Sequence, residues 1–166
     1  MVTQDTSKTH AGHLKVFIDG ASAGVTLGGP ELTYEKEAID IDTDDFGIVD
    51  KSITNNSATV TVRFAQVEPD VLALAIPEAT LTASGTVEVG SSRGTSLLSV
   101  AKTLVLSGTN GTNSQQWTFH KAFVEEGFDL SYEDEQSVIE VPFRVVPDPD
   151  NLTATDALFK YETFVT

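Results

Sequence analysis

The stretch Gly29-Pro30-Glu31-Leu32-Thr33-Tyr34-Glu35-Lys36-Glu37 recurs 98 positions later as Gly127-Phe128-Asp129-Leu130-Ser131-Tyr132-Glu133-Asp134-Glu135. The glycine, the leucine, the tyrosine and two glutamates are identical, and Glu/Asp and Thr/Ser exchange conservatively. Leucine and tyrosine are two positions apart, so on a β-strand they share one face and the polar residues share the other. The repeat predicts a sheet built from two similar units, which is typical of a scaffold rather than a catalyst.

The same period-two alternation continues outward from the repeat. Residues 14–18 alternate, Asp19-Gly20 supplies a turn, and 25–27 would be the return strand of a hairpin. We expect further strands at 31–41, 57–64, 80–89, 96–107, 115–124, 128–133 and 137–146, with an acidic loop and a polar stretch over 42–56. Only 68–76 is expected to be helical, because Pro69 and Asp70 suit a first turn and Pro77 stops it. The pattern predicts an all-β fold with one short helix, a β-sandwich or barrel.

The length of 166 residues and the 40% hydrophobic content predict one domain with one core. We expect a flexible N-terminal arm at 1–12, a β domain at 13–150 and an extended C-terminal arm at 151–166. No run approaches the roughly 18 apolar residues of a membrane span, and the first residues have no signal-peptide pattern. The absence of cysteine excludes disulfides and thiolate metal sites, and it fits a protein made in the cytosol.

Ten Lys and Arg against 25 Asp and Glu give a net charge of −15. Such a surface repels phosphate backbones, which argues against ordinary DNA or RNA binding. Solubility is the simplest use of a charge so far from zero.

Two short motifs suggest chemistry that their surroundings do not support. Gly20–Gly24 reads G-x-S-x-G, but a catalytic serine needs a turn from strand to helix, and here strand and turn residues follow. A small hydrolase using Ser22 is therefore the weaker alternative. Asp40–Asp44 begins like a calcium loop, yet its sixth and twelfth positions are Asp45 and Lys51 instead of Gly and Glu.

Other candidate residues are few. The three histidines, His10, His13 and His120, have neither the spacing of a metal site nor that of a catalytic triad. Trp117 favours a core or interface position, with a sugar-stacking role as the alternative. Together with calcium at 40–45, that role would make the protein a carbohydrate-binding or adhesin-like β-sandwich. We expect no enzymatic activity, no cofactor and no metal.

The order of these features resembles the tail tube (major tail) proteins of long-tailed bacteriophages. The resemblance covers residues 13–150 and runs through Val16–Gly20, the segment Gly28–Tyr34, the acidic loop, the alternating strand, the Glu-Pro-led helix Glu68–Pro77 and the late strand Ile139–Pro149. It implies a structural virion protein that forms hexameric rings, which stack into the conduit for viral DNA ejection. It also implies assembly in the host cytoplasm, residence in the virion tail, and tape-measure, tail terminator and baseplate or tail-tip proteins as partners. DNA would pass through without specific binding.

The resemblance further implies that a long loop contacts the neighbouring ring. The candidate is 42–56, with contact residues Asp42, Asp44, Asp45, Phe46, Asp50 and Lys51. Period-two alternation in the repeated strands places a set of carboxylates opposite the leucine and tyrosine. These are the candidates for an acidic surface that faces the lumen of the tube, with an ordinary solvated face as the alternative: Glu31, Glu35, Glu37, Asp129, Glu133 and Glu135.

Overall fold

The structure is a computed structural model that describes residues 14–24, 26–43, 47–65, 68–76, 78–90, 93–110, 113–127, 129–132 and 137–165. The main antiparallel sheet has nine strands: β1 (Lys15–Ile18), β2 (Ala21–Ser22), β3 (Glu31–Thr43), β4 (Gly47–Phe64), β7 (Lys102–Asn110), β8 (Asn113–Val124), β9 (Asp129–Tyr132), β10 (Ser137–Val146) and β11 (Phe159–Val165). A separate hairpin contains β5 (Ala79–Leu81) and β6 (Val87–Val89), and short 3-10 turns lie at Leu97–Val100 and Pro149–Asn151. Among the described residues the one α-helix is α1 (Pro69–Ala75), which confirms the expected all-β fold with one short helix.

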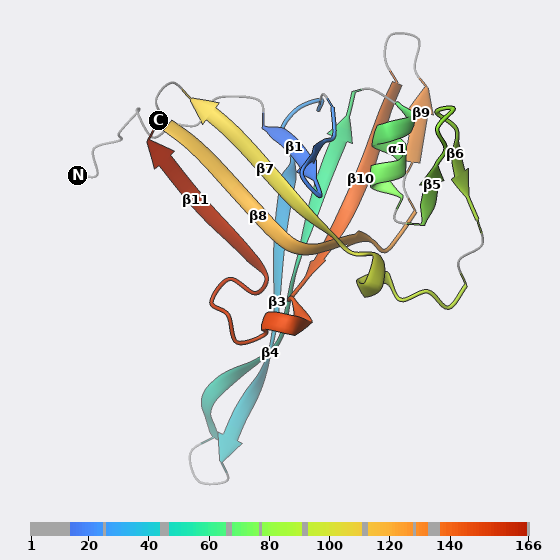
Figure 1. The fold of residues 1–166 in the computed structure, drawn as a ribbon. Helices are drawn as coiled ribbons and strands as arrows, with labels where there is room; N and C mark the ends of the chain where they lie inside the picture. Colours follow the sequence, from blue (N-terminus) through green and yellow to red (C-terminus); the bar gives the residue numbers. More distant parts are fainter. Residues whose placement is uncertain are drawn as a thin grey trace.

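The strands follow the order β2-β1-β7-β8-β10-β4-β3, and the sheet forks at β8. The first part of β8 pairs with β11, whereas its last four residues pair with β10, so two wings diverge from β8 (Figure 1). The described strands do not close into a barrel, because β2 and β3 at the two ends of the order do not pair. The chain after β2 nevertheless crosses to the other wing, where Thr26 bridges Phe64 and the Leu27 N–H donates to the Arg63 carbonyl (2.8 Å).

One hydrophobic core lies between the wings. Alternate residues of β1, β4, β7 and β10 point into it, as the period-two pattern predicted. Strand β8 adds Phe119 and Ala122, and α1 adds Val71 and Ala75. Its largest fully buried side chains are Phe64, Phe119, Ile18, Leu104, Ile139, Val16, Val60, Val62, Val141 and Val145. Burying one such side chain contributes about 1.5–3 kcal/mol, so this cluster supplies the main stabilisation that both wings share.

The repeated segments occupy equivalent positions in the sheet, which confirms the two-unit prediction. The first copy lies in β3, which pairs with β4, and the second lies in β9, which pairs with β10. In the first hairpin Leu32 faces Val60 and Tyr34 faces Ala58; in the second, Leu130 faces Ile139 and Tyr132 faces Ser137. Because β4 and β10 also pair antiparallel to each other, a local two-fold axis relates the two hairpins.

The two hairpins differ in the segment that joins their strands. Residues 133–136 connect Tyr132 to Ser137, whereas residues 35–57 connect Tyr34 to Ala58. We call residues 35–57 the ribbon. In its described part β3 and β4 stay paired as far as Thr43 and Gly47, and the ribbon projects well beyond the body of the molecule (Figure 1). The expected loop at 42–56 is therefore wrong for residues 42–43 and 47–56, which belong to β3 and β4 because the two strands stay paired there.

Three further expectations need correction. The return strand expected at 25–27 is β2 instead, because Asp19 and Gly20 both adopt positive φ (48° and 80°) and turn the chain within two residues. The strand expected at 80–89 is two short strands with Gly85 at the turn, where φ is 77°. The C-terminal segment is not an extended arm, since β11 pairs along seven residues of β8. Residues 1–13 lie outside the described part of the chain.

Candidate functional site

In the described structure the ribbon exposes the largest group of aliphatic side chains to solvent. Its aliphatic side chains are largely exposed, with Ile39 at 57%, Ile48 at 60% and Ile53 at 59% of their full accessibility. Ile41 and Val49 are exposed as well. A two-stranded hairpin is at best marginally stable alone in water, and contiguous exposed apolar residues mark interaction sites. The ribbon is therefore the strongest candidate for a surface that another protein covers.

Aliphatic residues lie on both faces of the ribbon. Ile39 and Ile41 share one face of β3, while Ala38 and Asp42, on the other face, lie opposite Ile53 and Ile48 of β4. Register shifts at Glu37/Ala38 and Ile41/Asp42 interrupt the ladder, and such irregularities increase the local twist. A partner that removes all this apolar surface from water has to contact both faces.

The contact residues expected on the ribbon are only partly described. Asp42 faces Ile48, and Asp50 faces Ile41. Lys51 Nζ lies 2.8 Å from Asp40 Oδ1 on the opposite strand. Both of these side chains are well exposed, so the ion pair adds little stability and mainly holds the lysine in place. Asp44, Asp45 and Phe46 lie outside the described residues.

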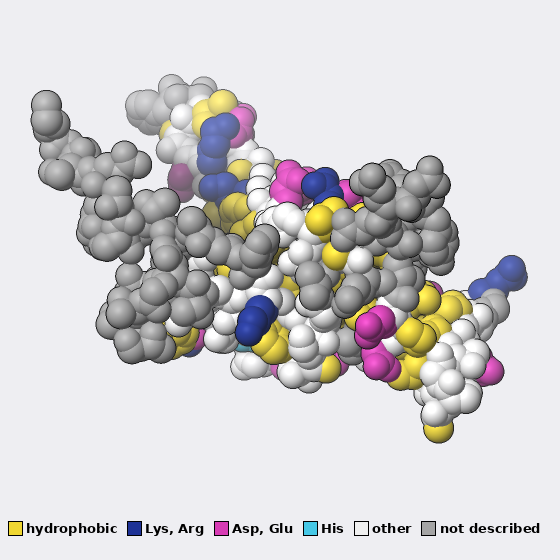
Figure 2. Space-filling model, turned by 90° about the horizontal axis from the view of Figure 1, so that it is seen from above, with side chains coloured by type: hydrophobic (Ala, Val, Ile, Leu, Met, Phe, Trp, Pro, Cys, Tyr) yellow, Lys and Arg dark blue, Asp and Glu magenta, His cyan; other side chains and the backbone are white. Residues whose placement is uncertain are grey.

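The carboxylates expected on an acidic surface fall into two groups. Glu31, Glu35 and Glu37 are exposed on β3, opposite Thr61, Ser57 and Asn55 of β4 and on the face away from Leu32. Asp129 belongs to β9, where it pairs with Glu140, but its side chain lies outside the described part, as do Glu133 and Glu135. The structure brings the first three together on one strand. Seen from above, the Asp and Glu side chains of the described surface are scattered among uncharged and hydrophobic ones (Figure 2).

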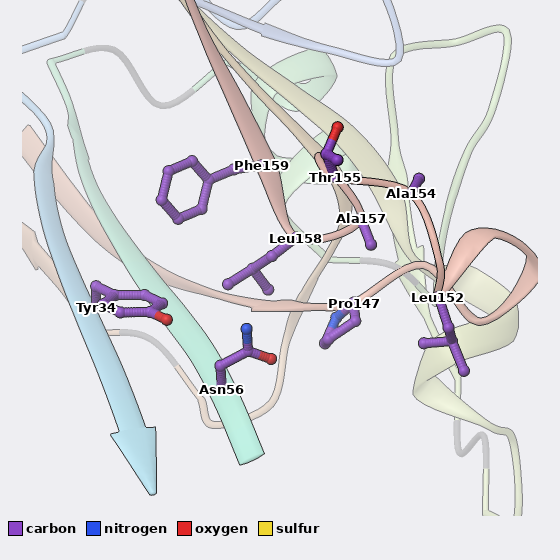
Figure 3. Close-up of a pocket in the computed structure, with 9 residues that line it drawn as sticks. All are labelled: Tyr34, Asn56, Pro147, Leu152, Ala154, Thr155, Ala157, Leu158 and Phe159. Atoms are coloured by element: carbon purple, nitrogen blue, oxygen red, sulfur yellow. The ribbon is translucent and has the colours of Figure 1, made fainter. Parts of the chain in front are cut away.

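A pocket of about 450 Å³ opens at the base of the ribbon (Figure 3). Tyr34 and Asn56 form one side, and the segment leading into β11 forms the other, including Leu158 and Phe159. The Tyr34 and Phe159 rings meet edge to face, with centroids 6.1 Å apart. Sequence reasoning missed this pocket because its walls are about 90 positions or more apart, and the pairing of β10 with β4 and of β11 with β8 brings them together.

Trp117 lies within an aromatic cluster instead of standing alone. Its ring centroid is 4.5 Å from that of Tyr161, 5.8 Å from that of Phe159 and 6.4 Å from that of Phe119. The side chain is half-buried and packs against the core. These neighbours give Trp117 a packing role between β8 and β11, in agreement with its expected core or interface position.

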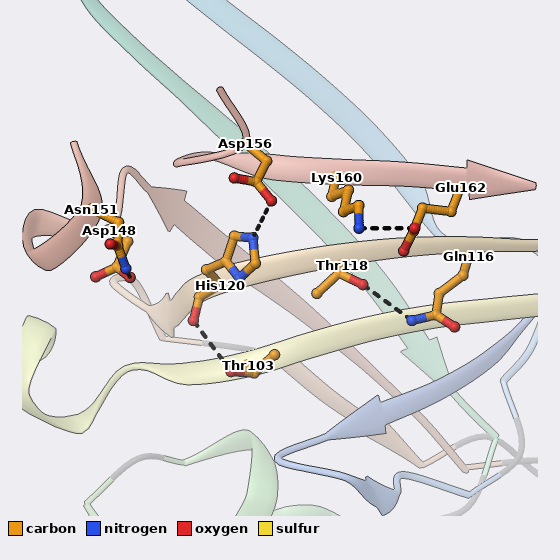
Figure 4. A network of polar contacts seen from close by, with 9 residues as sticks. All are labelled: Thr103, Gln116, Thr118, His120, Asp148, Asn151, Asp156, Lys160 and Glu162. Carbon is orange, nitrogen blue, oxygen red and sulfur yellow. Dashed lines mark hydrogen bonds and ion pairs between the residues drawn. The ribbon is translucent and has the colours of Figure 1, made fainter. Parts of the chain in front are cut away.

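The outer face of β7, β8 and β11 carries polar side chains that pair with one another (Figure 4). Lys160 Nζ lies 2.8 Å from Glu162 Oε1, and the hydrogen bond to Glu162 raises the pKa of Lys160. Gln116 Nε2 donates to Thr118 Oγ1 (3.2 Å), and His120 Nε2 lies 3.7 Å from Asp156 Oδ2. Within the described residues no group of three or more His, Asp or Glu side chains is arranged to hold a metal ion.

In the part of the chain that the structure describes, the two remaining sequence motifs lack the surroundings of a catalytic serine and of a calcium loop. Ser22 lies in β2 opposite Phe17, within a hairpin, so the strand-to-helix turn of a catalytic serine is not formed there. Asp40 is engaged by Lys51 across the ribbon. No helix in the described part is long and apolar enough to span a membrane.

Comparison with known proteins adds no family. No protein-family model matches the chain, and no curated protein matches it.

Proposed function

We propose that this protein is a structural subunit of a bacteriophage tail tube, with a fold of the tail tube type. Copies would form hexameric rings, and the rings would stack into the conduit through which viral DNA is ejected. The observation that carries this proposal is the ribbon, which exposes aliphatic side chains on both faces and places none of its described residues in the hydrophobic core. A monomeric protein rarely exposes a segment of this kind, because such apolar surface is normally covered by a partner.

The position of the ribbon favours head-to-tail stacking. Because β4 and β10 are antiparallel, the ribbon and the Tyr132–Ser137 end of the β9–β10 hairpin lie at opposite ends of the sheet. A contact between the ribbon of one copy and a different surface on the next is heterologous, and heterologous contacts build filaments. The candidate contact residues Asp42, Asp50 and Lys51 belong to this part of the chain.

The net charge of −15 suits a conduit for DNA. A tube wall rich in carboxylates offers phosphates no binding partner, so the polyanion does not adhere during passage. With a Debye length of about 8 Å at physiological salt, this repulsion acts only close to the wall. It would keep DNA from sticking and would not drive its movement.

Under this proposal the protein has no catalytic activity and works in the virion tail after assembly in the host cytoplasm. Its partners are further copies of itself, together with the tape-measure, tail terminator and baseplate or tail-tip proteins. DNA is cargo and not a ligand.

Electron microscopy of concentrated protein tests the proposal. We expect rings or tubes in negative stain for the wild type, and their loss in Ile48→Thr/Ile53→Thr, which keeps strand-forming residues but removes apolar surface. The matched control is Leu81→Thr/Val89→Thr, which changes two exposed aliphatic residues of the β5–β6 hairpin and should still assemble. Wild-type particles that stay monomeric even with a tape-measure protein present would contradict the proposed function.

A further inference from the structure

Acidic residues are distributed very unevenly across the sheet. Strands β1, β2, β7 and β8 contain no Asp or Glu, although the chain has 25 such residues. The same four strands carry three lysines, Lys15, Lys102 and Lys121. They are neighbours at one end of the strand order, and we call them the acid-free wing. Asp19, in the turn beside it, has its carboxylate engaged by the Thr103 N–H (2.8 Å).

The opposite end of the strand order is strongly acidic. It is β3, which carries five carboxylates and one lysine: Glu31, Glu35, Glu37, Asp40, Asp42 and Lys36. All of these side chains are exposed. Strand β3 pairs with β4 on one side, and within the described residues no strand pairs with its other edge. Unpaired edges of this length are usually covered in native proteins.

From this polarity we infer that copies of this chain associate side by side, with the acidic β3 edge of one copy against the acid-free wing of the next. This inference rests on the proposed function and adds to it the surfaces that join neighbours within a ring. The partner is a second copy because this chain itself carries both complementary surfaces, at opposite ends of one sheet. Such a contact is heterologous, so a suitable rotation between neighbours closes it into a ring.

The charge pattern determines how neighbouring copies align more than how tightly they bind. Opposite charges across an interface align the partners and disfavour wrong ones, since two acidic edges brought together would repel each other. The acid-free wing is the one large part of the sheet where a β3 edge meets no strand carboxylates. In this arrangement Glu31, Glu35 and Glu37 face a neighbouring copy and not the channel.

A zero-length carbodiimide crosslinker, which joins lysine amines to nearby carboxylates, provides the first test on assembled wild-type protein. Mixing ¹⁴N- and ¹⁵N-labelled protein before assembly identifies by mass spectrometry which crosslinks join different copies. We expect intermolecular links between β3 carboxylates and Lys15 or Lys121. Assembled protein whose intermolecular links exclude β3 and the acid-free wing would overturn the inference and leave the proposed function intact.

Charge exchange provides the second test. We make two charge-reversed variants, Glu35→Lys/Glu37→Lys and Lys15→Glu/Lys121→Glu. Each should raise the concentration needed for half-maximal assembly by about tenfold or more, and the variant that combines all four changes should return this concentration to the wild-type value. The control Glu78→Lys/Glu88→Lys makes the same net charge change near α1 and β6 and should not weaken assembly.

The outcomes separate the two ideas. If assembly were limited only by repulsion between negatively charged copies, Glu35→Lys/Glu37→Lys and Glu78→Lys/Glu88→Lys would both assemble better than the wild type. That result would overturn the inference. Absence of rescue in the combined variant would overturn it too. A wild type that never assembles would instead refute the proposed function, and the inference with it.

Discussion

Val62 of β4 and Val141 of β10 face each other across the strand ladder, at the point where the local two-fold axis relates the two repeated hairpins. Around this pair Val60-Thr61-Val62-Arg63-Phe64 corresponds to Ile139-Glu140-Val141-Pro142-Phe143. The inward positions are hydrophobic in both copies and fully or almost fully buried. The repeat visible in the sequence therefore extends from the first strand of each hairpin into the second, where it forms the centre of the core.

Truncating either valine should destabilise the protein by a similar amount. We expect Val62→Ala and Val141→Ala each to lower the free energy of unfolding by about 2 kcal/mol, because both side chains are fully buried and leave a cavity. The double variant should deviate from additivity, since the two residues are in contact. Urea denaturation measures these values, and the exposed Val49→Ala should change stability by less than about 0.5 kcal/mol. Strongly unequal effects would show that the two units are not energetically equivalent.

The ribbon should be dispensable for folding. Replacing residues 35–57 with Glu133-Asp134-Glu135-Gln136, the connection of the other hairpin, removes no member of the hydrophobic core cluster. We expect the unfolding free energy to change by less than about 1 kcal/mol while association is lost. Circular dichroism melting and sedimentation velocity measure the two effects. A chimera that is unfolded would show that the ribbon supports the body, and one that still assembles would show that other surfaces suffice.

Trp117 should matter for packing and not for sugar binding. Trp117→Phe keeps an aromatic ring between β8 and β11 and should be tolerated, whereas Trp117→Ala should destabilise by about 2–4 kcal/mol through lost aromatic contacts. Thermal denaturation with and without calcium and a glycan array distinguish the functions. Glycan binding that disappears in Trp117→Phe without loss of stability would favour the carbohydrate-binding alternative.

The contribution of Lys160 to stability should be lost only at high pH. The hydrogen bond to Glu162 raises the pKa of Lys160 above its ordinary value of 10.5, so the pair stabilises the fold below that value and the stabilisation is lost as the pH rises through the raised pKa. The melting temperature of the wild type should exceed that of Lys160→Gln by a small, constant amount from about pH 7 to about pH 9. The difference should shrink at higher pH. A difference that grows with pH would contradict the assigned ion pair.

The sequence predicted most strands because their inward positions are hydrophobic at every second residue. Strand 137–146 is found with those bounds, and 57–64 is the inner part of β4. The short helix is found at Pro69–Ala75, where Pro69 fixes the start as expected. These elements were predictable because they face the core, and the alternation of hydrophobic and polar residues indicates which side chains are buried.

The hydrophobic pattern of the sequence could not predict the ribbon, the fork of the sheet at β8 or the pocket. The strand at 31–41 was predicted, but in the stretch expected to be a loop Ile48 and Ile53 lie among polar residues without facing a core, so that stretch did not show a strand pattern. The pairing of β11 with β8 depends on contacts between distant segments, which local alternation does not specify. The charge difference between the ends of the sheet was present in the sequence, but it becomes visible only once the strand order is known.

The long connection in the first hairpin makes a nearly symmetric pair of units directional. If both hairpins had a four-residue connection, the two ends of the β3–β4–β10–β9 sheet would be alike, and a stack of such molecules would have no direction. With the 23-residue ribbon at one end and a four-residue connection at the other, each molecule has two unlike ends, so a stack of copies has a distinct top and bottom.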